Sequence, residues 1–110
     1  MTTAPLALTT ATFEDALAGA GTQPFLADFW VQGCGPCKAL APVLAEAAAE
    51  QADRLTVGMV QLEHAPELAA RYEIMALPTL IVFVGGLEKT RLTGASTKAE
   101  LLAELEEFLA

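Results

Sequence analysis

The sequence predicts an α/β domain in which helices cover both faces of a mixed sheet. Helix-like and strand-like segments alternate over most of the chain, as they do where helices connect parallel strands. The last two strand-like segments, Leu80–Val84 and Leu87–Leu92, are joined by Gly85-Gly86, a two-residue loop typical of an antiparallel hairpin. The chain has 110 residues, 54% of them hydrophobic, which suffices for a single domain over residues 1–110 with its own core.

The first half of the chain contains two predicted helices on either side of a predicted strand. Thr12 is expected to cap the first helix. Phe25–Val31 is almost entirely apolar, which is typical of a strand covered on both faces, and Asp28 is its single charged residue. Lys38–Gln51 is rich in Ala, Leu and Glu, which favour a helix, and Pro42 is expected to kink that helix.

The second half contains a further strand and two further helices besides the hairpin. Leu55–Leu62 predicts a second buried strand, and Pro66–Arg71 predicts a short helix that begins at a proline. Thr97 and Glu100 form a capping box that predicts the start of the last helix. The apolar residues expected on the inner side of that helix are Leu101, Leu102, Leu105, Phe108 and Leu109.

The charge of the chain argues against several classes of partner. Fourteen Asp and Glu residues against six Lys and Arg give a net charge of −8. Such a chain repels phosphate backbones and anionic lipid, so neither nucleic acid nor a membrane is expected as a partner. Met1–Thr12 lacks the features of a signal peptide, and two cysteines do not indicate a secreted disulfide scaffold. We therefore expect a cytoplasmic protein.

The spacing of Cys34 and Cys37 suits a reversible redox pair. Residues three apart in a helix have Cα atoms about 5 Å apart, inside the window of roughly 4.4 to 6.8 Å that a disulfide requires. Cys34 lies at the start of the predicted helix, where free N–H groups favour the thiolate and lower its pKa. Cys37 lies one turn further in and is expected to be less exposed, as suits a resolving thiol.

Three other uses of the cysteine pair remain open. A zinc site needs four ligands, and because His64 is the only further Cys or His, a closed site requires a dimer. A permanent structural disulfide would close a small ring that constrains little of the unfolded chain. The pair could also be an idle pair at the surface. A Cys-x-x-Cys that opens a helix after a strand favours the redox function over all three.

Several short motifs occur in a fixed order along most of the chain, from about Phe13 to Leu109. They are Asp28-Phe29-Trp30, Cys34-Gly35-Pro36-Cys37-Lys38, Pro42, Leu77-Pro78-Thr79, Gly85-Gly86 and Gly94. In this order and spacing they resemble the thioredoxin family. The resemblance implies the thioredoxin fold, a central five-stranded mixed sheet flanked by four helices, with strand order 1-3-2-4-5 and a short first strand near Ala4–Leu8.

The resemblance also implies a reaction. The substrate would be a protein disulfide, which the Cys34 thiolate attacks to form a mixed disulfide. Cys37 would then attack Cys34, release the reduced target and leave a Cys34–Cys37 disulfide. A flavin-dependent thioredoxin reductase that draws on NADPH would restore the dithiol. We expect no bound cofactor, no metal ion and a monomer.

Other residues gain expected roles from the same resemblance. Pro78 would have a cis peptide bond and face the cysteines, although a proline at a strand entry needs no such role. Leu77, Pro78, Gly33 and Gly94 would contact the substrate, whose extended segment pairs with the exposed backbone. Met75-Ala76 is expected to influence which targets dock. The residues expected to shape the site are Gly35, Pro36, Trp30 and Lys38, with Trp30 beside the cysteines.

The resemblance implies that Asp28 accepts the proton of Cys37 through water, a role that suits a carboxyl whose pKa is raised toward neutrality by burial. The alternatives without that role are a hydrogen-bonded buried aspartate and a cap at the end of the strand. The chain has Met59 where the family has Lys, so nothing in the sequence offsets the Asp28 charge and its pKa is expected to be higher still.

Gly33 stands where the family usually has Trp, which removes apolar contact area and a constraint on the loop. Because Gly33 and Met59 affect docking and proton transfer, the alternative function is a thioredoxin-fold partner or assembly module with weak general reductase activity. An oxidase or isomerase is a third option, which a measured redox potential would distinguish.

Overall fold

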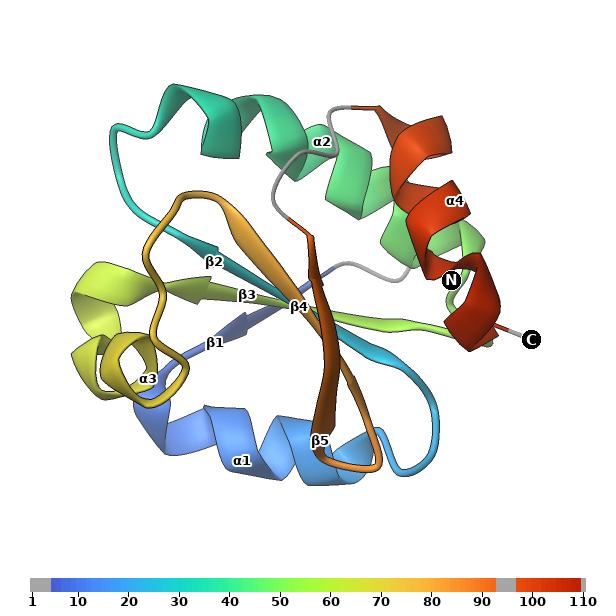
Figure 1. Cartoon of the computed structure of the whole chain (residues 1–110), viewed down its shortest axis with the longest axis horizontal. Coiled ribbons are helices and arrows are strands. Elements are labelled where there is room, and N and C mark those ends of the chain that lie inside the picture. Colours follow the sequence, from blue (N-terminus) through green and yellow to red (C-terminus); the bar gives the residue numbers. More distant parts are fainter. Residues whose placement is uncertain (1–4, 93–96, 110) are drawn as a thin grey trace.

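The computed structural model describes residues 5–92 and 97–109. Within these residues a five-stranded sheet lies between two layers of helices (Figure 1). The elements, in chain order, are β1 (Leu6–Leu8), α1 (Thr10–Gly19), β2 (Phe25–Trp30), α2 (Gly35–Glu50), β3 (Thr56–Gln61), the 3-10 turn η1 (Leu62–His64), α3 (Pro66–Arg71), β4 (Thr79–Val84), β5 (Leu87–Leu92) and α4 (Lys98–Leu109). The predicted α/β class and the five-stranded sheet with four helices are confirmed.

The strand order places one end of the sheet in position to carry a site. The strands run in the order β1-β3-β2-β4-β5, as predicted. β1, β3 and β2 are parallel, whereas β4 is antiparallel to β2 and β5 to β4. Trp30 is in register with Gln61, and Phe29 with Thr79. The carboxyl ends of β2 and β3 therefore meet the amino end of β4 at one edge.

Two hydrophobic cores lie on the two faces of the sheet. α2 and α4 cover one face and α1 and α3 the other (Figure 1). Residues of β2 alternate between them, so that Leu26 packs under α2 and α4, whereas Phe25 and Phe29 pack with α1 and α3. By this alternation Asp28 points to the same side as Leu26. The apolar character of β2 follows from burial on both faces.

The start of one helix differs from the prediction. The predicted cap at Thr12 is wrong, because α1 begins at Thr10 and Thr9 is its N-cap. Thr12 lies in the first turn, where its Oγ1 accepts the Thr9 N–H at 2.9 Å. α2 begins at Gly35, directly after Cys34, which the sequence places at the start of this helix. The other predicted segments lie within two residues of the observed elements.

Two predicted local motifs are confirmed. Glu100 donates its N–H to Thr97 Oγ1 at 3.1 Å, and Thr97 donates its N–H to Glu100 Oε1 at 3.1 Å, which is the capping box at the start of α4. Gly85 and Gly86 have φ values of 61° and 82°, as a two-residue type I′ hairpin turn requires. Pro42 lies inside α2, and the kink at this position stays a prediction.

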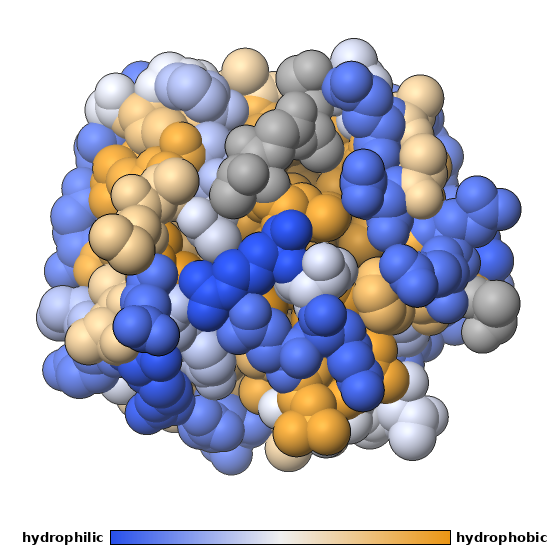
Figure 2. Space-filling view, viewed as in Figure 1, coloured by the Kyte–Doolittle hydropathy of each residue, from blue (hydrophilic) through white to orange (hydrophobic). Residues whose placement is uncertain are grey.

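The strand at one border of the sheet is polar and exposed. β5 presents Glu88, Lys89 and Arg91 to solvent, and Arg91 Nε pairs with Glu88 Oε2 at 2.6 Å. Figure 2 shows hydrophilic residues across the middle of the view, where β5 runs in Figure 1. Charged side chains on a border strand oppose pairing with a second sheet. This border is therefore a poor docking surface for an extended partner.

Candidate redox site

Cys34 and Cys37 form a disulfide where β2 leads into α2. Their Cα atoms are 5.2 Å apart, inside the range that a disulfide needs. Cys34 is the N-cap residue of α2, and Cys37 lies in the first turn. The predicted placement of both cysteines is confirmed.

The start of α2 creates different surroundings for the two sulfur atoms. The Cys37 backbone N–H donates to Cys34 Sγ at 3.1 Å, and the positive end of the helix dipole lies at the same place. Both effects favour a thiolate on Cys34 once the disulfide is reduced. Cys34 is partly exposed, whereas Cys37 is 3% exposed. The outer sulfur is therefore suited to attack a partner and the inner one to resolve the product.

The segment before Cys34 is a four-residue turn that the sequence did not predict. The Cys34 N–H donates to the Val31 carbonyl at 3.4 Å, and Gly33 at the third position has φ +84°. A positive φ at this position is typical of type II turns and strongly favours glycine. A Cβ on Gly33 would meet no atom of the described chain within 4 Å, so the backbone rather than space explains the glycine.

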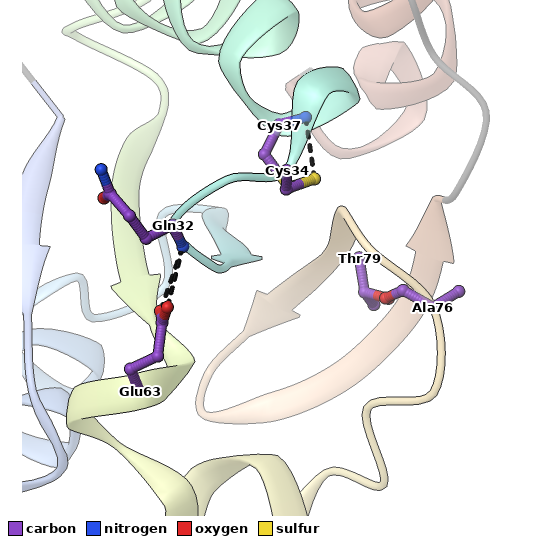
Figure 3. Close-up of a disulfide and its surroundings, with 6 residues drawn as sticks. All are labelled: Gln32, Cys34, Cys37, Glu63, Ala76 and Thr79. Carbon is purple, nitrogen blue, oxygen red and sulfur yellow. Dashed lines mark hydrogen bonds between the residues drawn. A yellow bond between two sulfur atoms is a disulfide. The ribbon is translucent and has the colours of Figure 1, made fainter.

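A carboxylate holds this turn from the neighbouring strand connection, a contact that sequence reasoning missed. The Gln32 N–H donates to both oxygens of Glu63, at 3.1 and 3.0 Å (Figure 3). Gln32 lies two residues beyond Trp30, and Glu63 two residues beyond Gln61, the registered pair that ends β2 and β3. The sequence does contain a signal for this contact, because Glu63 comes just after one parallel strand and the loop with Gln32 comes just after the neighbouring strand.

The segment before β4 faces the cysteine pair. The Leu77–Pro78 bond is cis, as predicted. The Thr79 hydroxyl donates to the Ala76 carbonyl, and Figure 3 shows these residues across from Cys34 and Cys37. Leu77 is 37% exposed, so this apolar residue is open to a partner.

The carboxyl of Asp28 is fully buried, and no described residue offsets its charge with a hydrogen bond. It is in register with Met59 on β3 and with Leu80 on β4, and both neighbours are apolar. Neither of its oxygens has a hydrogen-bond partner among the residues that the structure describes. Burial accordingly raises the pKa of Asp28 from 3.8 to about 7. The expected upward shift is confirmed, whereas the role of Asp28 as a proton acceptor stays a prediction.

Trp30 follows Asp28 on the same face of β2. It lines a hollow of about 250 Å³ at the β1 side of the sheet. The other residues around this hollow are Pro5, Ala7, Leu8, Thr9, Met59, Gln61 and His64. The packing of Trp30 beside the cysteines stays a prediction.

The remaining predicted site residues lie around the start of α2 or beyond the described chain. Gly35, Pro36 and Lys38 are exposed in the first turn of α2. Gly94 lies outside the described residues. Over residues 5–92 and 97–109, no group of three or more His, Cys, Asp or Glu side chains could hold a metal ion.

Comparison with known proteins matches this geometry. The Thioredoxin family model matches residues 4–107. The chain is 42% identical to a thioredoxin of Alicyclobacillus acidocaldarius over 106 residues, which is 96% of this chain and 99% of that protein. It is 42% identical to a thioredoxin of Mycolicibacterium smegmatis over 108 residues, 96% of each chain. It is also 43% identical to a bifunctional thioredoxin reductase/thioredoxin of Mycobacterium leprae, over 88% of this chain and 21% of that protein. The chain therefore belongs to the thioredoxin family, and with its Cys34–Cys37 pair it is a thiol–disulfide oxidoreductase.

Proposed function

We propose that the chain reduces disulfide bonds in other proteins. The observation that supports this most is Cys34, a partly exposed residue at the start of α2 that forms a disulfide with the buried Cys37. In the reduced protein the Cys34 thiolate attacks one target sulfur, the target disulfide breaks, and its second sulfur leaves as a thiolate that takes a proton from solvent. Cys37 then attacks Cys34 Sγ, which releases the reduced target and oxidises the pair.

Asp28 is the proposed proton acceptor for Cys37. A thiol attacks as a thiolate, so the second step needs a base. The pKa of Asp28, about 7, suits proton exchange near neutral pH, and the carboxyl lies on the face of β2 that α2 covers. Its buried, unpaired oxygens, in the part of the chain that the structure describes, leave it free to act through water.

The proposed docking surface surrounds the disulfide. An extended target segment pairs with the backbone at Leu77, next to the cis bond of Pro78, with Gly33 and Gly94 as further contacts. Thr79 stabilises the backbone of this surface, because it is buried and its hydroxyl donates a hydrogen bond to the Ala76 carbonyl.

The proposed electron source is NADPH, delivered by a flavin-dependent thioredoxin reductase. The M. leprae relative, whose name joins a thioredoxin reductase to a thioredoxin, supports such a pairing. We place the chain in the cytoplasm, as a monomer that binds neither nucleic acid nor membranes, in keeping with its net charge of −8. Among the described residues, no helix has the length and apolar character needed to cross a bilayer.

Insulin reduction tests the proposal. With dithiothreitol, and then with a thioredoxin reductase and NADPH, the chain is expected to reduce insulin well above the rate of the electron donor alone. Turbidity of the released insulin chain and NADPH consumption measure the two rates. Activity at background would contradict the proposal and favour a partner or assembly module. A strongly oxidising redox potential would instead indicate an oxidase or isomerase.

Met75 is expected to contribute to docking. Its side chain is 94% exposed, two residues before Leu77, so a bound target can bury it. Complete burial of a methionine stabilises by about 1.5 to 3 kcal/mol, so partial burial corresponds to about a three- to tenfold effect. We expect Met75→Gln to lower kcat/KM for insulin by that factor.

The matched control for Met75 is Leu87→Gln. Leu87 is also exposed, at 64%, but it follows the β4–β5 turn at the far end of β4, about 17 Å from Thr79. This variant should reduce insulin at the wild-type rate. Equal losses in the two variants, or none in Met75→Gln, would show that Met75 does not touch the target.

A further inference from the structure

The turn that carries Cys34 is weakly held by its own bonds. The hydrogen bond that closes it, from the Cys34 N–H to the Val31 carbonyl, is 3.4 Å long, beyond the usual range of about 2.7 to 3.2 Å. Gly33 lies inside the turn and has no side chain to pack, and glycine has more backbone freedom than any other residue type. A turn built this way needs an external contact to keep one conformation.

Glu63 supplies that contact. Both of its carboxylate oxygens accept the Gln32 N–H, at 3.1 and 3.0 Å, and hydrogen bonds to an ionised acceptor are about twice as strong as neutral ones. The backbone of Glu63 is itself fixed, because the Ala65 N–H donates to the Leu62 carbonyl at 3.1 Å and Ala65 is fully buried. The turn is thus tied to a rigid part of the fold (Figure 3).

We infer that Glu63 is a positioning residue that fixes the Val31–Cys34 turn and thereby keeps Cys34 Sγ at the N–H groups of α2. This inference rests on the proposed function for its meaning, since a fixed sulfur matters where that sulfur attacks targets. Gln32 is two residues from Cys34, so movement of the Gln32 amide displaces the N-cap residue directly. A displaced Cys34 loses the Cys37 N–H contact and with it part of the support for its thiolate.

A pair of substitutions separates the hydrogen bond from the charge. Glu63→Gln keeps a neutral oxygen that can accept the Gln32 N–H, whereas Glu63→Ala removes the acceptor, and both remove the charge. Glu67→Ala is the matched control, because Glu67 also accepts a hydrogen bond, from Thr10 Oγ1 at 3.0 Å, but on the α1–α3 side of the fold.

Hydrogen exchange of the Gln32 amide measures the anchor, and alkylation of Cys34 by iodoacetamide across pH measures its consequence. In Glu63→Ala we expect Gln32 to exchange about tenfold faster or more. The pH profile of alkylation should have a higher midpoint than in Glu63→Gln, and kcat/KM for insulin should fall about three- to tenfold. Glu63→Gln and Glu67→Ala should retain most of the protection and the activity.

The inference is overturned if Gln32 exchange is unchanged in Glu63→Ala. It is equally overturned if exchange accelerates while the alkylation profiles of the Ala and Gln variants coincide. Alkylation needs no target protein, so it reports on Glu63 even if wild-type protein fails to reduce insulin. Such a failure would count against the proposed function alone.

Discussion

Replacing Cys37 with serine is expected to stop turnover at the mixed disulfide. Cys34 remains at the helix start and still attacks a target. The variant lacks the Cys37 sulfur, whose residue lies 5.2 Å from Cys34 between Cα atoms, so no second thiol releases the target. Insulin reduction should fall to background, and covalent adducts between Cys34 and target cysteines should accumulate. Electrophoresis without reductant, followed by mass spectrometry, detects these adducts and identifies the targets.

Cys34→Ser is the control for this trapping. It keeps a sulfur at position 37, but that sulfur is 3% exposed and one turn inside α2. We expect neither turnover nor adducts from this variant. Adducts on Cys37 in similar yield would mean that the two sulfurs have exchanged roles. Sustained turnover in Cys37→Ser would contradict the proposed two-step reaction.

Much of the fold could be predicted because its signals are local. The nearly apolar run Phe25–Val31 predicts a strand covered on both faces, and Gly85-Gly86 predicts the hairpin. The start of α1 was missed because threonines near it compete for the cap, and the choice depends on which N–H groups they satisfy. Thr97 was easier, since Glu100 completes its capping box.

The site divides in the same way. Cys34 and Cys37 are three residues apart, so helix geometry alone brings their sulfurs together. Glu63 and Gln32 are 31 residues apart, and their contact depends on the register of two parallel strands, which composition does not reveal. The sequence shows Gly33 only as a missing large side chain, whereas its positive φ shows that the turn itself favours glycine.

Asp28→Asn is expected to have the second large effect, and its sign depends on pH. The pKa of Asp28 is raised from 3.8 to about 7 in the fold, so below about pH 4 the carboxyl is neutral in folded and unfolded chains alike. As pH rises from 4 to 7 the unfolded chain ionises first. The free energy of unfolding then falls by about 1.4 kcal/mol for each pH unit, or about 4 kcal/mol in all.

Asparagine cannot ionise, so Asp28→Asn escapes this loss. The unpaired amide of the variant costs about 1 to 3 kcal/mol at every pH, so the change with pH is the sharper measure. Urea unfolding should show the variant gaining about 4 kcal/mol over wild type between pH 4 and pH 8 and exceeding it in stability at pH 7. Asp15→Asn, at an exposed position of α1, is the matched control for an Asp-to-Asn change outside the core.

The Asp28→Asn variant is expected to fold but to release its targets more slowly. If Asp28 takes the proton of Cys37, wild-type release of a trapped target should accelerate as pH rises through about 7, the pKa of the buried carboxyl. Asp28→Asn should lose that acceleration and release targets about a hundredfold more slowly at neutral pH. Attack by Cys34 on a fresh target should be nearly unchanged, since this step precedes the proton transfer. A variant that gains stability and loses only the second step would link both effects to the buried carboxyl of Asp28. A stabilised variant that releases targets at the wild-type rate would show that Asp28 has no role in turnover.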